Sequence, residues 1–246
     1  DLIGRDGFTS FKALERLVEA SPATIRRDLE RLAGQGRLSR LRGGARLAEP
    51  PRGHTHLGGV PFHENIGRNP KAKSAIGRAA AGLCAPGEAV MIDGGSTTLQ
   101  MCPHLAGLDL QVLTNSLHIV SALLPKPDTR ILAPAGTVFR DQNIILSAEC
   151  EDGMPCFHAP KLFMGAAAVG RRGVMRADIL LVAVERRLIE RADEIILLVD
   201  SSKFSLSSGH VVCGLESLET VVTDSGLTEA DRELLTSAEI RVVIAD

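Results

Sequence analysis

The chain has no tryptophan and no tyrosine, and aromatic residues make up only 3% of its 246 residues. Its five cysteines are odd in number and form no CxxC pair, so the sequence indicates reduced thiols rather than a disulfide framework. It also lacks any run of about 18 apolar residues, and its polar start is no signal peptide. We therefore expect a cytoplasmic protein with no membrane partner.

Two groups of candidate metal ligands occur, and neither has the spacing of a familiar zinc site. We predict no metal site and no cofactor, although the sequence leaves a metal role open for the first group. The groups are Cys150, Cys156 and His158, with Glu149 and Asp152 nearby, and His54, His56 and His63 in a stretch rich in glycine and proline.

Positive charge is concentrated at the front of the chain. Residues 1–48 contain ten Lys/Arg and six Asp/Glu, a balance of +4, whereas residues 49–246 contain eighteen against twenty-four, a balance of −6. This asymmetry indicates that the front segment binds a polyanion while the larger remainder has another role.

Residues 9–32 contain two apolar stripes with helical spacing, separated by a short turn. Ser21 and Pro22 form a favourable helix start, because the hydroxyl caps exposed N–H groups and proline at the first helical position loses no hydrogen bond. Two short helices joined by a tight turn are typical of a helix-turn-helix. The stripes are Phe11, Leu14, Leu17 and Val18, and then Ile25, Leu29 and Leu32.

Hydroxyl and guanidinium groups lie outside the apolar stripe of the second helix, where they could reach bases and phosphates in the major groove. Arginine and apolar residues then alternate around Gly43 and Gly44, which predicts a two-stranded wing over residues 37–47. The alternative is an ordinary helix with a solvated basic face. The candidate DNA contacts are Ser21, Thr24, Arg26, Arg27 and Arg31 on the helix, and Arg40 and Arg42 on the wing.

Residues 21–29, together with 36–38 and 42–45, resemble the DNA-binding signature of the DeoR family of bacterial transcriptional regulators. In that family the first of these segments is the recognition helix of a winged helix-turn-helix. The resemblance implies that Thr24, Arg26 and Arg27 contact DNA, with the wing arginines beside them.

Proline and glycine in residues 49–70 predict a linker rather than a continuous helix. It would join a winged helix-turn-helix domain over 1–48, which we expect to be truncated at its start, to an α/β domain over 71–246. Strands alternate with helices in the second domain, which predicts a mainly parallel sheet covered on both faces. Strands are predicted at 90–92, 110–113, 130–133, 161–164, 194–199, 220–223 and 240–243, and helices at 72–83, from 99, from 117 to about 124, at 180–191 and at 229–237.

Three polar loops follow predicted strands, at the sheet edge where open α/β proteins bind ligands. In the first, glycines would let backbone N–H groups reach an anion beside serine and threonine hydroxyls at a helix start. A purely structural interpretation remains, in which these residues only shape and cap turns. The loops are residues 93–98 (Asp-Gly-Gly-Ser-Thr-Thr), 114–116 (Thr-Asn-Ser) and 200–203 (Asp-Ser-Ser-Lys).

The second domain also resembles the DeoR sensor domain over nearly its whole length, through these loops, Gly165 and Glu185. That domain is similar in fold to ribose-5-phosphate isomerase and binds phosphorylated sugars or related metabolites. The resemblance implies that residues 95–98 hold the phosphate and that Asp93, Asn115 and Lys203 contact the polyol or the phosphate. The predicted effector-binding residues are Asp93, Gly94, Gly95, Ser96, Thr97, Thr98, Thr114, Asn115, Ser116, Gly165 and Lys203.

We therefore expect a homo-oligomeric transcriptional regulator that binds double-stranded operator DNA, represses a carbohydrate-uptake or catabolic operon, and responds to a phosphorylated sugar or polyol. The alternative is a sugar-phosphate isomerase with an appended DNA-binding domain. Isomerisation needs a carboxylate base; residues 164–169 contain none, although Asp93 and Glu185 could serve. We predict no catalytic residues and no enzymatic activity. A third possibility is a DNA-binding module whose α/β domain binds no ligand.

Overall fold

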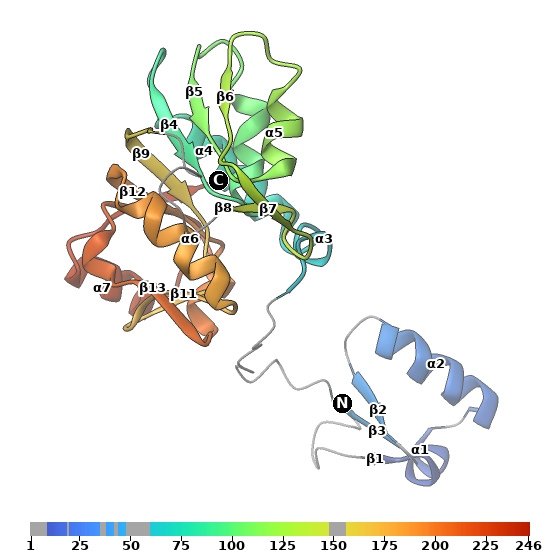
Figure 1. Cartoon of the computed structure of the whole chain (residues 1–246). Coiled ribbons are helices and arrows are strands. Elements are labelled where there is room, and N and C mark those ends of the chain that lie inside the picture. Colours follow the sequence, from blue (N-terminus) through green and yellow to red (C-terminus); the bar gives the residue numbers. More distant parts are fainter. Residues whose placement is uncertain (1–8, 19, 35–37, 42–43, 48–59, 148–155) are drawn as a thin grey trace. The chain divides into compact units, whose positions relative to one another are not determined.

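The computed structural model describes residues 9–18, 20–34, 38–41, 44–47, 60–147 and 156–246 (Figure 1). Contacts divide the chain into two units, residues 1–53 and residues 54–246. The end of the expected linker, residues 60–69, therefore belongs to the second unit.

The first unit contains helices α1 (Phe11–Leu17) and α2 (Pro22–Gly34) and strands β1 (Thr9–Ser10), β2 (Leu38–Leu41) and β3 (Gly44–Leu47). The strands form an antiparallel sheet in the order β1-β3-β2. The hydroxyls of Ser10 and Ser21 accept hydrogen bonds from the N–H groups of Ala13 and Thr24, which caps both helices. The predicted pair of helices and two-stranded wing are confirmed. The core of the first unit is formed by Leu14, Ile25, Leu29, Leu38 and Ala45.

The second unit is organised around a seven-stranded sheet in which every pairing is parallel. The strand order is β15-β14-β12-β9-β4-β5-β6, so the central strand β9 lies between β12 and β4. All seven predicted strands are confirmed. They are β4 (Ala89–Ile92), β5 (Gln111–Leu113), β6 (Arg130–Leu132), β9 (Ala159–Met164), β12 (Ala192–Leu198), β14 (Thr220–Asp224) and β15 (Arg241–Ala245).

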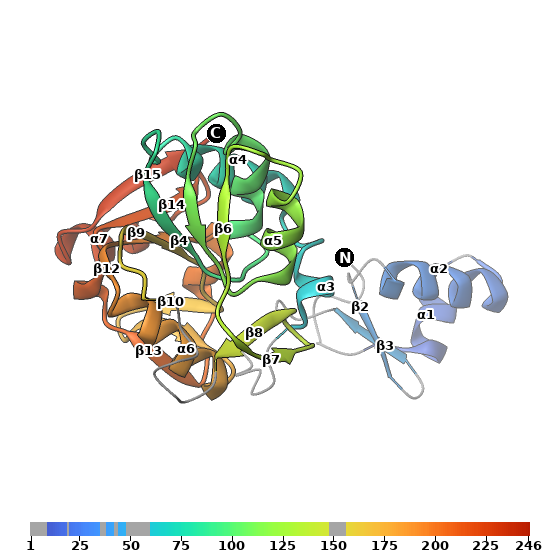
Figure 2. The same ribbon diagram turned by 45° about the horizontal axis from the view of Figure 1, so that its top comes forward.

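Successive side chains of these strands enter two different hydrophobic cores, because strand residues alternate between the two faces of a sheet. Val90 and Ile92 join the core that contains residues of α4 (Pro70–Ala81), the 3-10 helix η1 (Thr98–His104) and α5 (Leu117–Leu123). Met91 joins the core with residues of α6 (Ile179–Ile189) and α7 (Glu229–Ser237). Helices therefore cover both faces of the sheet, as predicted (Figure 2).

The segment after the loop 93–98 forms a helix, as predicted, and this helix is the 3-10 helix η1. Pro103 lies inside it and has no N–H group to donate to the carbonyl of Leu99. The aligned backbone dipoles of a long α-helix are therefore not available at this loop.

Several elements of the second unit are not predicted by the sequence patterns. Strands β7 (Gly136–Phe139) and β8 (Ile144–Ser147) form an antiparallel hairpin. Strands β10 (Ala168–Gly170), β11 (Gly173–Arg176) and β13 (His210–Cys213) form a small antiparallel sheet. A short helix, α3 (Phe62–Asn65), lies within the expected linker and beside the β7–β8 hairpin (Figures 1 and 2). The described residues also contain the 3-10 helices η3 (Ser201–Ser205) and η4 (Leu215–Ser217).

Candidate functional site

The exposed face of α2 carries three of the predicted DNA contacts. Thr24, Arg27 and Arg31 are three and seven residues apart and therefore share one side of the helix, away from the buried Ile25 and Leu29. Arg31 Nη2 lies 3.0 Å from Asp28 Oδ1 in a solvent-exposed ion pair. Exposed pairs contribute little to stability, so this guanidinium could exchange its partner for a phosphate.

The other predicted DNA contacts have different surroundings. Ser21 Oγ lies 2.8 Å from Thr24 Oγ1 and caps α2. The guanidinium of Arg26 lies over the ring of Phe11 on α1, 5.1 Å from the ring centroid, so it also joins the two helices. Arg40 is part of β2, and Arg42 lies outside the described residues.

In the second unit, two predicted ligand loops meet through direct hydrogen bonds. Asn115 Nδ2 donates to Asp93 Oδ1 at 3.0 Å, and Asn115 Oδ1 accepts from the N–H group of Gly94 at 2.9 Å. Asp93 and Asn115 are 2% and 1% exposed. A carboxylate at this depth needs such partners, because burial otherwise disfavours its charged form.

Several hydroxyl groups of these loops form hydrogen bonds within the loops or cap a helix, as expected if they only shape and cap turns. Thr98 Oγ1 donates to the carbonyl oxygens of Asp93 and Gly95, at 2.7 and 3.0 Å. Thr114 Oγ1 accepts from the N–H group of Ser116, and Ser116 Oγ caps α5 by accepting from Ile119. Ser96 and Thr97 are also buried. The backbone is closely packed here as well, since a Cβ on Gly94 would lie 2.5 Å from the side chain of Ile144.

Arg176, which the sequence analysis did not identify, joins Asp93 to Glu185. Its Nη2 atom lies 3.0 Å from Asp93 Oδ2 and 2.5 Å from Glu185 Oε1. Burial raises the pKa of Glu185 well above its ordinary value, against the lowering effect of Arg176, and the neighbouring Asp93 raises it further. The Arg176 guanidinium therefore lies between two buried carboxyl groups, those of Asp93 and Glu185. Gly165 adjoins this cluster, because its Cβ position lies 3.9 Å from Arg176 Nη2.

A second charged group is formed by two lysines on α4 and η3. Lys73 is only 1% exposed, and its Nζ donates to the carbonyl oxygen of Asn65. Burial and, to a smaller extent, the nearby charge of Lys203 lower the pKa of Lys73 to about 8. Burial also lowers the pKa of Lys203, whereas Asp200 raises it and Arg176 lowers it. A buried ammonium group with a second, half-buried one nearby favours a bound anion, which would stabilise both charges.

Asp200 organises the loop that carries Lys203. It is 2% exposed and accepts hydrogen bonds from Asn69 Nδ2 at 2.9 Å and from the N–H group of Ser202 at 3.2 Å. The three predicted loops follow β4, β5 and β12, which are strands of one parallel sheet, so the loops lie at the same edge of that sheet. A groove of about 550 Å³ opens at this edge, lined by Asn69, Pro70, Lys71, Ala72, Asp200, Ser201, Ser202 and Asp224.

Helix α4 also packs closely on η1, next to the loop 93–98. A Cβ on Gly77, one turn after Lys73, would lie 2.4 Å from the backbone carbon of Gln100. A glycine is therefore required for this approach. The buried lysine was missed because a lysine in an alanine-rich helix has the sequence signature of a solvated side chain.

Within the described residues, no three His, Cys, Asp or Glu side chains are placed to hold a metal ion. Cys156 is exposed, and His158 Nε2 lies 2.8 Å from Asp193 Oδ1. Cys150, His54 and His56 lie outside the described residues. No helix in the described parts of the chain is long and apolar enough to cross a membrane.

A winged helix-turn-helix joined to a parallel α/β unit with charged side chains at its carboxyl edge defines a class of DNA-binding regulators. Residues 1–50 match the DeoR-like helix-turn-helix domain, and residues 68–225 match the DeoR C terminal sensor domain. The chain belongs to the DeoR family.

Similar proteins support the regulator rather than the isomerase alternative. The HTH-type transcriptional repressor GlcR of Bacillus subtilis is 28% identical over 231 residues, which is 94% of this chain and 87% of GlcR. The HTH-type transcriptional regulator UlaR of Shigella flexneri is 25% identical over 244 residues, 99% of this chain and 94% of UlaR. The protein is a DNA-binding transcriptional regulator.

Solved structures that resemble the chain include ribose 5-phosphate isomerase A of Methanocaldococcus jannaschii. That likeness has a TM-score of 0.42 and 15% identity, and it covers 55% of each chain. It is too weak to carry an argument about activity.

Proposed function

We propose that this regulator is a cytoplasmic repressor of a carbohydrate-uptake or catabolic operon and that a phosphorylated sugar or polyol, bound in the second unit, controls its affinity for operator DNA. The observation that carries the proposal is the buried Lys73 with the half-buried Lys203 nearby, beside Asp200. The name of the relative GlcR, a transcriptional repressor, supports repression.

The charged side chains at the carboxyl edge of the sheet suit both the phosphate and the polyol of such an effector. Lys73 and Lys203 would neutralise the phosphate, with the loop 95–98 contributing backbone N–H groups. The amide of Asn115 and the carboxylate of Asp93 would bind hydroxyl groups of the polyol, because one donates and the other accepts. Gly165, Gly94, Thr114 and Ser116 would shape the surrounding wall.

On the DNA, the proposed contacts are Thr24, Arg26, Arg27 and Arg31 in the major groove, with Ser21 fixing the start of α2 and Arg40 and Arg42 on the wing. A homo-oligomer would place two such units on two half-sites, which multiplies the specificity of one short helix. The effector would act by linkage, since a ligand that prefers one of two arrangements of the oligomer shifts the population toward it.

A thermal-shift screen of phosphorylated sugars and polyols, each beside its unphosphorylated form, tests this function. Binding to the native state raises the melting temperature by mass action. We expect a rise with one or a few phosphorylated compounds and none with their unphosphorylated partners. A rise with unphosphorylated compounds alone, or with none, would refute an anion-dependent effector.

A further inference from the structure

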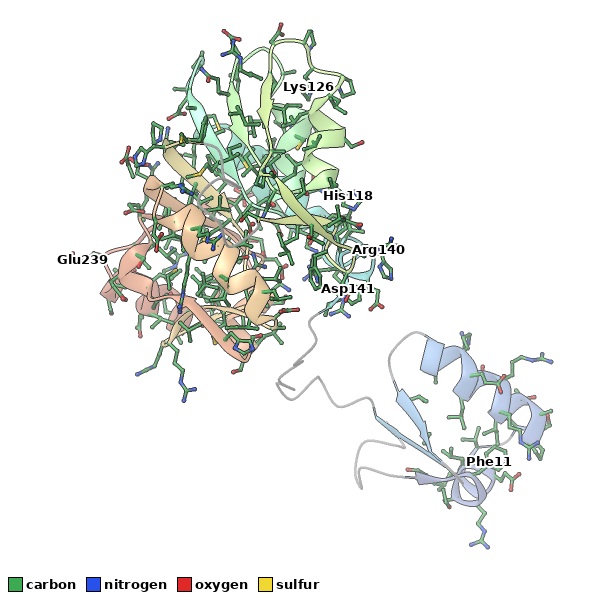
Figure 3. The ribbon with its side chains drawn as sticks, in the orientation of Figure 1. Phe11, His118, Lys126, Arg140, Asp141 and Glu239 are labelled. Carbon is green, nitrogen blue, oxygen red and sulfur yellow. The ribbon has the colours of Figure 1, made fainter. Side chains whose placement is uncertain are left out.

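The end of the expected linker, residues 60–69, contacts the site region at two places. The first contact involves α3 and the turn of the β7–β8 hairpin. The ring of Phe62, which is 4% exposed, stacks on His118 with 4.2 Å between the ring centroids and 14° between the planes. The N–H group of Phe62 donates to the carbonyl of Asp141, and Gln142 Nε2 donates to the carbonyl of Val60. Figure 3 shows His118, Arg140 and Asp141 beside this short helix.

This first contact continues directly into the loop 114–116. His118 lies two residues after Ser116, and its Nε2 atom is 3.1 Å from Asn143 Nδ2. The carbonyl of Asn143 accepts from the N–H group of Leu117, and the carbonyl of Asn115 accepts from Ile145. The hairpin is therefore bonded to the backbone of the loop whose Asn115 side chain holds Asp93.

The second contact joins the other end of the segment to the lysine cluster. Asn65 accepts a hydrogen bond from the buried ammonium group of Lys73. Asn69 donates to Asp200 at 2.9 Å and to Ser202 Oγ at 3.3 Å. Asn69 has φ of 48°, in the left-handed region that residues other than glycine seldom adopt, so these side-chain bonds hold an unfavourable backbone conformation in place.

We propose that residues 60–69 couple occupancy of the effector site to the end of the linker, with Phe62, His118 and Asn69 as positioning residues. A four-residue helix such as α3 is not stable alone, so its order depends on these two contacts. Both contacts belong to loops that would move or stiffen when an anion binds. Occupancy would therefore order the segment through which the second unit meets the linker. This inference rests on the proposed function.

Hydrogen exchange of the full chain, with inorganic phosphate as the probe and chloride at equal ionic strength as the reference, tests the coupling. We expect phosphate to raise the melting temperature and to slow exchange in residues 60–66 at least about threefold, with no change in α7 as an internal reference. A rise in melting temperature without slower exchange in residues 60–66 would overturn the inference and leave the proposed function standing. The absence of any rise would count against the anion site itself, and the inference would fall with it.

A matched pair of histidine variants separates coupling from folding. His118→Ala removes the ring under Phe62, whereas His63→Ala removes an exposed histidine from α3 itself. We expect His118→Ala to speed exchange in residues 60–66 at least about tenfold, to abolish the effect of phosphate there, and to retain the phosphate-induced rise in melting temperature.

The exposed control, His63→Ala, should behave as the parent protein. Gln142→Ala, which removes only the bond to the carbonyl of Val60, provides a milder variant if His118→Ala fails to fold. Parent-like exchange and a parent-like response to phosphate in both His118→Ala and Gln142→Ala would refute the coupling.

Discussion

In the first unit, Arg27 and Arg31 are exposed on α2 above a small apolar core, whereas in the second unit Lys73, Asp93 and Asp200 are only 1–2% exposed. On the function proposed above, this difference reflects the size of the binding partner. DNA is a long polyanion that exposed charges can meet along a helix, with counterion release as a driving force. A small anion offers few contacts, so selectivity depends on charges that are removed from water, where each interaction is stronger.

The largest effect should come from breaking the buried ion cluster of the second unit. Arg176→Leu leaves Asp93 and Glu185 facing each other, and loss of one member of a buried pair costs about 3–5 kcal/mol. We expect a decrease of this size in the free energy of unfolding of that unit, measured by circular dichroism in urea. Arg172→Leu, which removes an exposed arginine nearby, is the control. A loss below about 1 kcal/mol in Arg176→Leu would show that the buried charges are not coupled.

Removing the buried ammonium group should act on effector binding instead. Lys73→Met keeps the length and apolar stem of the side chain but loses the hydrogen bond to Asn65, so we expect a loss of stability of about 1–3 kcal/mol. The loss of a charge-assisted hydrogen bond, worth about 1.5–3 kcal/mol, should weaken binding of the phosphorylated compound found in the screen about 10- to 100-fold. Titration calorimetry measures this affinity, with Lys126→Met as the control. Unchanged affinity would place the phosphate elsewhere.

The exposed arginines of the first unit should act more weakly and in a salt-dependent way. Arg27→Ala should lower operator affinity about tenfold and reduce the slope of log affinity against log salt by about 1, without changing the effector-induced thermal shift. Fluorescence anisotropy at several salt concentrations measures both quantities, and Arg16→Ala on α1 is the control. Equal effects of the two substitutions would mean that α2 does not provide the specific contact. Arg26→Ala should weaken DNA binding and also lose the contact with Phe11.

The smallest effect concerns the protonation of Lys73. Its pKa is lowered to about 8 in the free protein, and a bound phosphate favours the charged form and so raises this pKa. Effector affinity should therefore be constant below about pH 7 and fall as pH rises through 8, by less than about tenfold per pH unit. Calorimetric titrations between pH 7 and 9 test this, and Lys73→Met should remove most of the dependence. Affinity that rises with pH would contradict the proposed role of Lys73.

Local patterns were sufficient to predict the main architecture. The strand at Val90 and the helices at Leu29 and Leu235 follow from apolar periodicity, which is a property of neighbouring residues. Helix α3 was missed because its order depends on contacts with His118 and the β7–β8 hairpin. The helix expected after Thr98 is present, and its 3-10 type depends on Pro103, which changes the hydrogen-bond pattern.

The site was predictable only in part, for a similar reason. The three loops could be expected to share one edge because they follow parallel strands. Arg176 lies 83 residues from Asp93 and follows a short antiparallel turn, so its pairing with the carboxylate cannot be recognised from the residues around either of them. Which hydroxyls cap a turn and which remain for a ligand also depends on the folded backbone, as Thr98 and Ser116 show. The roles assigned to individual residues stay predictions.

The order of the strands has a consequence for the protein during its own synthesis. The first unit occupies about the first fifth of the chain, and its pairings are local, so it can fold while the rest is still being made. The central strand β9 and Arg176 emerge long after Asp93, and Asp200 and Lys203 emerge later still. A growing chain therefore contains the DNA-binding unit well before it contains the residues proposed to control it, and premature termination in that interval would release a DNA-binding unit without its sensor.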